Sequence, residues 1–262
     1  MRRLFVALIL LTLVGCVTSP TATVPSKDKE LSRASDRARA AFEDGATAKA
    51  IDLYTRALNR ARAMDNAMEI ADTAYNLALC YIVEGQLDQA STSLAEAEAA
   101  FERSGSTPPD VLLLEATVAQ RQGKLEQAVS LADQVLSASF EQNNQFQAVL
   151  LKGTVACEQD DLASARAARA EANQYHVINI PLRAARERLT GSILLLESNP
   201  VEAAAAFDRA AALFQEAKHY RDMALTLQRA GEAYREAGDP QRAEDRLFRA
   251  KRSLAAQGEK AE

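Results

Sequence analysis

The chain has 262 residues and a formal net charge of −5, with 31 Lys and Arg against 36 Asp and Glu. This negative balance offers no field to hold phosphates and argues against nucleic-acid binding by charge. Alanine supplies 53 residues while Gly, Pro and Trp number 10, 7 and 0, which favours many helices and few strands. Three cysteines and two histidines exclude a disulfide scaffold and argue against a zinc site.

The chain begins with a segment that has the form of a secretory leader. Arg2 and Arg3 precede an apolar run at residues 4–14. This run is too short to cross a hydrocarbon core, which needs about 20 residues. Basic residues, a short apolar core and a small residue at the end are typical of a signal peptide, which we expect at residues 1–15.

Residues 13–16, LVGC, resemble the lipobox of bacterial lipoproteins. In that motif the cysteine takes a diacylglyceryl group and the leader is cleaved just before it, where Gly15 supplies the required small residue. The resemblance implies a lipid on Cys16 that anchors the protein to a bilayer. Val17 is not the Asp that retains many such proteins at the inner membrane, so the implied location is the periplasmic face of the outer membrane. An incidental cysteine in an ordinary leader, or a host with a single membrane, is the alternative.

Residues 16–30 are expected to form a disordered tether behind the lipid. The segment after Cys16 is polar, contains Pro20 and Pro25, and shows no apolar period. Its length reaches at most about 50 Å when extended. The folded part of the chain can therefore stand away from the membrane.

One sequence unit recurs six times between residues 31 and 256. Turn-forming residues mark the units at intervals of 40, 38, 37, 38 and 40 positions. The marks are Gly45, Gly85, Gly123, Asp160, Ser198 and Gly238. A small residue precedes every mark by seven positions: Ala38, Ala78, Ala116, Gly153, Gly191 and Gly231. Alanine follows every mark by five positions: Ala50, Ala90, Ala128, Ala165, Ala203 and Ala243.

This spacing predicts a helix, a tight turn and a second helix in each unit. Small residues let two helix backbones approach closely, and a bulky residue nine positions after the mark fills the gap beside them. Gly, Asp and Ser at the mark tolerate the dihedral angles of the turn. The pattern is weaker in unit four, where Arg169 replaces the bulky apolar residue. Stacking such pairs buries a continuous core.

The pattern resembles the tetratricopeptide repeat, although the units are longer than its usual length of about 34 residues. The resemblance implies an all-α, right-handed superhelical solenoid of six helix-turn-helix repeats at about residues 31–256, followed by a polar tail at 257–262. The expected repeats are 31–64, 71–104, 109–142, 146–179, 184–217 and 224–256.

Residues that could carry catalysis or hold a metal are few. His176 and His219 have no second ligand at a suitable spacing, and no nucleophile elbow or phosphate loop occurs. We therefore predict no enzyme activity, no metal and no cofactor beyond the lipid on Cys16. Cys80 and Cys157 lie two units apart, and helix pairs stack at about 10 Å, so both are predicted to be free rather than bridged.

In the tetratricopeptide family the first helices line the concave side, and their outward positions bind partner segments. The resemblance thus implies a groove with an apolar middle and a charged end, which suits an extended or helical peptide. The alternative is a tightly coiled superhelix in which these residues contact one another. The implied groove residues are Arg39, Phe42, Tyr75, Leu79, Ile82, Leu113, Thr117, Gln120, Leu150, Thr154, Arg188, Ser192, Leu195, Gln228, Glu232 and Arg235.

Lipoproteins of this construction serve as adaptors or assembly factors in secretion, pilus, β-barrel and peptidoglycan machinery. The resemblance to them implies a protein-protein interaction role, with envelope proteins or peptide segments as partners and the membrane reached through the lipid. The alternative is a periplasmic module that senses or binds a small ligand or glycan.

Overall fold

A computed structural model describes residues 28–105 and 108–257, and every regular element in this part is an α-helix. The leader, Cys16 and most of the expected tether lie outside the described residues. The twelve helices pair into the six expected units. Units one to three are α1 (Lys29–Glu43) and α2 (Thr47–Ala63), α3 (Ala67–Val83) and α4 (Leu87–Ser104), and α5 (Pro109–Arg121) and α6 (Leu125–Ala138). Units four to six are α7 (Gln142–Glu158) and α8 (Leu162–Ala172), α9 (Ile180–Leu196) and α10 (Pro200–Glu216), and α11 (Tyr220–Glu236) and α12 (Pro240–Ala256).

The turns inside the units form at the six mark residues, as predicted. All six have a left-handed backbone, with φ from 72° to 76° at the four glycines and 56° at Asp160 and Ser198. At the end of α3, the Gly85 amide donates to the carbonyl of Ile82, and the Gln86 amide to that of Tyr81. This pair of bonds satisfies the last carbonyls of the helix and reverses the chain.

The recurring small residues lie where helices cross, which confirms the packing prediction. The six alanines five positions after the marks are at most 2% exposed. A Cβ added to Gly191 would lie 2.7 Å from the ring of Phe207, and one added to Gly231 would lie 2.7 Å from Leu247. In unit four, where Arg169 is not apolar, a residue of the next unit fills the gap beside Gly153. A Cβ added to Gly153 would lie 2.8 Å from the side chain of Leu189.

The observed unit boundaries differ from the predicted ones. Helix α1 begins at Lys29, because the side chain of Asp28 accepts from the Leu31 amide at 2.8 Å and caps the helix; residues 28–30, predicted to be part of the tether, thus belong to this helix and its cap. Units two, four, five and six each begin four residues earlier than predicted. Asn66 and Asn179 cap two of these helices, one turn before the apolar pattern that set the predicted starts. Helix α8 ends at Ala172, which leaves residues 173–179 as a connector.

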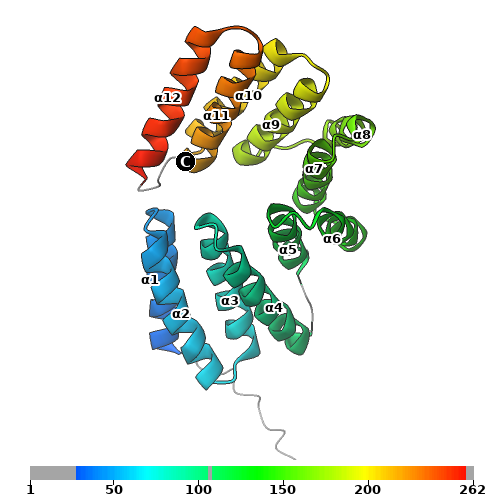
Figure 1. The fold of residues 1–262 in the computed structure, drawn as a ribbon. Helices are drawn as coiled ribbons and strands as arrows, with labels where there is room; N and C mark the ends of the chain where they lie inside the picture. Colours follow the sequence, from blue (N-terminus) through cyan, green and yellow to red (C-terminus); the bar gives the residue numbers. More distant parts are fainter. Residues whose placement is uncertain (1–27, 106–107, 258–262) are drawn as a thin grey trace, which may run out of the picture.

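The six pairs follow one another round a curve, and α1 and α12 both lie at the left of the view in Figure 1. Each helix packs against its neighbour along the chain, and α3 also contacts α5, α5 contacts α7, and α7 contacts α9. Contact between first helices of successive units places these helices on the inner side of the curve. Within the described residues, no helix combines the length and apolar character needed to cross a membrane.

Candidate functional site

A cavity of about 410 Å³ opens on the first-helix face of units three to six. Its walls are the first helices α5, α7 and α9, with one residue each from α10 and α11. Seven of the groove residues predicted from the sequence line it: Leu113, Thr117, Gln120, Leu150, Thr154, Arg188 and Ser192. The cavity therefore gathers residues from helices that lie more than sixty positions apart in the chain.

The predicted residues do not all have the predicted exposure. Leu113 and Leu150 were expected to point outward, but each is only 7% exposed and forms the floor of the cavity. Thr117 and Thr154 donate their hydroxyls to the carbonyls one turn earlier in their own helices, at 2.8 and 2.9 Å. Their oxygens are left as acceptors at the cavity wall.

The remaining predicted groove residues do not line this cavity. They are Arg39, Phe42, Tyr75, Leu79, Ile82, Leu195, Gln228, Glu232 and Arg235. Phe42 and Tyr75 pack against the core of units one and two, and Ile82 is buried within it. Burial, with a smaller effect from Asp110, raises the pKa of Tyr75 to about 12. These side chains contribute to packing in the first two units.

Eight lining residues were missed by the sequence prediction. They are Arg121, Gln147, Leu151, Leu182, Ala185, Leu189, Phe207 and Arg229. Arg121 and Arg229 each directly follow a predicted residue, Gln120 and Gln228. Arg121 also lies one helical turn after Thr117, so the spacing of a helix face is a signal that would find it. The positions ten and six before the mark line the cavity in units three to five but not in units one, two and six, and the repeat pattern does not encode that difference.

Three arginines, Arg121, Arg188 and Arg229, line the cavity. One donates a hydrogen bond to a backbone carbonyl, and the other two stack on aromatic rings. Arg121 donates from Nη1 to the carbonyl of Ile82 at 3.0 Å. The guanidinium of Arg188 lies 5.6 Å from the ring centre of Phe214, and that of Arg229 lies 5.6 Å from Phe207. Stacking on aromatic faces is a favourable arrangement for arginine.

The surroundings of Arg121 and Arg188 lower the pKa of both guanidinium groups. Burial lowers the pKa of Arg121, and the neighbouring cations Arg221 and Arg188 lower it further, while Asp222 opposes this effect. Burial also lowers the pKa of Arg188; Asp222 opposes this effect and Arg229 adds to it. The Arg188 side chain still keeps 42% of its surface open to water, so its head group is enclosed by protein but accessible. Guanidinium groups stay protonated at neutral pH, so the lining residues of the cavity carry three positive charges.

The arrangement is suited to binding a ligand. Within the part of the chain that the structure describes, no group of three or more His, Cys, Asp or Glu is placed to hold a metal. His219 stacks on Phe214 and lies 3.6 Å from Asp222, which accounts for its position. Cys80 and Cys157 are both free, as predicted. An apolar floor with polar and cationic walls can hold a ligand that has both characters.

No protein-family model and no curated protein sequence matches the chain. Solved structures do match. A tetratricopeptide repeat protein from Parabacteroides merdae ATCC 43184 is 15% identical, with a TM-score of 0.53 over 88% of each chain. The Rap conjugation gene regulator of the plasmid pLS20, solved in complex with the Phr* peptide, is 15% identical, with a TM-score of 0.67 over 90% of this chain and 65% of that one. BtubC from P. vanneervenii is 20% identical, with a TM-score of 0.51 over 90% of this chain and 95% of that one. These likenesses show a fold of the tetratricopeptide-repeat type.

Proposed function

We propose that this protein is a lipid-anchored adaptor or assembly factor of the bacterial cell envelope, which captures a peptide segment of a partner protein. The cavity of units three to six is the observation that carries the proposal. Its apolar floor and polar walls have the composition that holds a peptide segment, with side chains inserted and the backbone partly wet. The Rap regulator, whose fold is similar, was solved with a peptide bound, which supports a peptide as the ligand class.

The anchor rests on the LVGC motif at residues 13–16 and on Val17. In this proposal Cys16 carries the lipid, and the protein lies at the periplasmic face of the outer membrane. Several acyl chains would hold it there stably, because each buried CH₂ contributes about 0.8 kcal/mol. The segment between Cys16 and Asp28 would then connect the anchor to helix α1.

Site-specific photo-crosslinking in the producing cell tests the binding function. A photoreactive residue replaces Gln120, which lines the cavity, and in a matched control it replaces Gln127 of α6, which does not. We expect partner proteins, identified by mass spectrometry, to be joined at position 120 and not at position 127. The same products at both positions would contradict the proposal. Self-crosslinks alone, with a melting temperature that rises with an added small ligand, would favour a sensing module instead.

The anchor is tested by the intact mass of the protein extracted from membranes with detergent. We expect a mass increase equal to the acyl groups, located on Cys16, and its loss in Cys16→Ala together with release from the membrane fraction. An unmodified Cys16 in the membrane-extracted protein would contradict the lipid anchor and would leave the binding proposal intact.

A further inference from the structure

The charges on the cavity wall are all of one sign. Arg121, Arg188 and Arg229 line the cavity, and its described lining includes no Asp or Glu. The chain as a whole has more acidic than basic residues, 36 against 31. The cavity is therefore positive within a negative protein, and its positive groups come from three different helices, α5, α9 and α11.

The ion pairs of two of these arginines, Arg188 and Arg229, are long. Arg188 pairs with Asp222 at 3.7 Å, and Arg229 pairs with Glu232 at 3.7 Å. Both distances exceed that of a charged hydrogen bond, about 2.7 to 2.9 Å. By contrast, Arg246 on the last helix binds Asp208 at 2.7 Å. A guanidinium has five N–H donors in a planar fork, which fits a carboxylate.

The mutual repulsion of the cavity arginines gives an anion an added advantage. The charge of Arg229 disfavours the protonated form of Arg188, and the charge of Arg188 disfavours that of Arg121, while Asp222 favours both. An anion placed between the arginines would compensate this unfavourable interaction, and it would do so where partial exclusion of water strengthens the attraction.

The apolar floor of the cavity indicates that the ligand also carries apolar groups. Leu113, Leu150 and Leu189 are buried apolar residues that line the same cavity as the arginines. A free inorganic anion would leave this surface uncovered. A segment that carries a carboxylate next to aliphatic or aromatic side chains would use both features.

We infer that the cavity recognises an acidic peptide segment, in which a carboxylate binds Arg188 and Arg229 while adjacent apolar side chains cover the leucine floor. This inference rests on the proposed peptide-binding function and specifies the ligand chemistry. Positive charge then selects among partners, and apolar contact supplies much of the affinity.

The test begins with selection from a random phage-displayed peptide library on the full-length protein in detergent. We expect the selected peptides to be enriched in Asp or Glu beside Leu, Ile or Phe. In one selected peptide, replacing the acidic residue by its amide should weaken binding at least about tenfold. For Arg229→Gln, the preference for the acidic over the amide peptide should shrink markedly, because only Arg188 of the two partners then remains to bind the carboxylate. The matched control Arg56→Gln, at an exposed pair on α2, should keep the full preference.

Circular dichroism and melting temperature check that Arg229→Gln is folded; its side chain lies at the surface, so no buried void is created. Selected peptides that bind equally well as acid and amide would overturn the inference and leave the proposed function standing. Failure to select any peptide would count against both. An Arg229-dependent rise in melting temperature with inorganic phosphate alone, without peptide binding, would instead show a site for small anions and would overturn the inference.

Discussion

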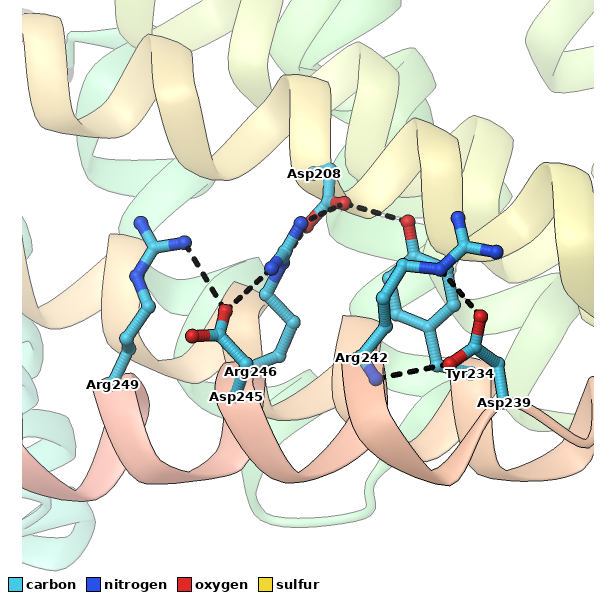
Figure 2. Close-up of polar contacts among 7 residues, drawn as sticks. All are labelled: Asp208, Tyr234, Asp239, Arg242, Asp245, Arg246 and Arg249. Atoms are coloured by element: carbon cyan, nitrogen blue, oxygen red, sulfur yellow. Dashed lines mark hydrogen bonds and ion pairs between the residues drawn. The ribbon is translucent and has the colours of Figure 1, made fainter.

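Asp208 of α10 and Arg246 of α12 are joined by two hydrogen bonds, at 2.7 Å from Nε and 2.9 Å from Nη2 (Figure 2). Tyr234 of α11 donates its hydroxyl to the same carboxylate at 2.8 Å. One carboxylate thus connects the last three helices. In a solenoid the terminal unit has a neighbour on only one side, so such contacts determine how firmly it is held.

Asp208→Asn is expected to destabilise the last unit. The amide keeps the shape of the side chain and can still accept from Tyr234, but it loses the charged pair with Arg246. We expect the free energy of unfolding to fall by about 2 kcal/mol, since hydrogen bonds to charged groups contribute about 1.5 to 3 kcal/mol. Urea denaturation gives the value, and faster hydrogen exchange in α12 locates the effect.

Asp52→Asn is the matched control for this variant. Asp52 pairs with Arg56 at 2.8 Å on α2, but the two side chains are 57% and 71% exposed. Exposed pairs contribute little because water and salt screen them, so we expect a change below about 0.5 kcal/mol. Equal losses for Asp52→Asn and Asp208→Asn would show that the shared carboxylate has no special structural role.

Gly191→Ala is expected to destabilise the protein, although alanine is the better helix former. An added Cβ would lie 2.7 to 2.9 Å from three ring atoms of Phe207, which is fully buried. Overpacking of this kind costs about 1 to 3 kcal/mol, more than the 0.5 to 1 kcal/mol gained in helix propensity, so a net loss near 1 kcal/mol is expected. Because Phe207 also lines the cavity, peptide binding should weaken in parallel.

The double variant tests the cause of this loss. In the Phe207→Leu background the ring is absent, so Gly191→Ala should cost little or become stabilising. Urea denaturation of the wild type, both single variants and the double variant gives the coupling energy. Additive effects would mean that the ring does not limit the substitution.

The repeat spacing predicted the fold because the same local requirement recurs in every unit. A left-handed turn needs Gly, Asp or Ser at the mark, and a close crossing needs small residues such as Gly191 and Ala203, so both requirements are visible in the sequence. The starts of α3 and α9 were missed because asparagine caps add a turn outside the apolar pattern.

The candidate site was predicted less completely, for a geometric reason. Thr117, Thr154 and Ser192 share one offset from their marks and all line the cavity, whereas Leu79 has the same offset and does not. The face that points inward depends on how each unit is rotated against the next. That rotation is set by packing between units, as where Leu189 fills the gap beside Gly153.

Both cysteines of the described fold are expected to react slowly with thiol reagents. Burial raises the pKa of Cys80 to about 12 and that of Cys157 to about 11. The thiolate is the reactive form, so at pH 8 very little of either thiol is available. In a Cys16→Ser background, Ellman's reagent should label the native protein slowly, Cys157 before the fully buried Cys80, and should label both rapidly in urea. Rapid labelling of native Cys80 would contradict the packing of α3.

Glu115 on α5 should make the fold less stable as the pH rises. Burial, with a smaller effect from Glu98, raises the pKa of Glu115 from 4.5 to about 7. Between these values the folded state binds more protons than the unfolded state, so the free energy of unfolding decreases with rising pH. The contribution of Glu115 is fully favourable below about pH 4.5 and is lost by about pH 7.

Glu115→Gln isolates this effect, because an amide is neutral at every pH. The stability of the variant minus that of the wild type should grow from pH 5 to pH 7 and then level off, as measured by urea denaturation at each pH. Glu98→Gln removes only the smaller of the two causes, the charge of Glu98. The loss of stability with rising pH should therefore still occur in this variant, but its midpoint should lie at a lower pH than in the wild type. A difference between Glu115→Gln and the wild type that does not change with pH would show that Glu115 is solvated and ionised in the folded protein. In that case the α4–α5 boundary would admit water, and its packing would be looser than the structure indicates.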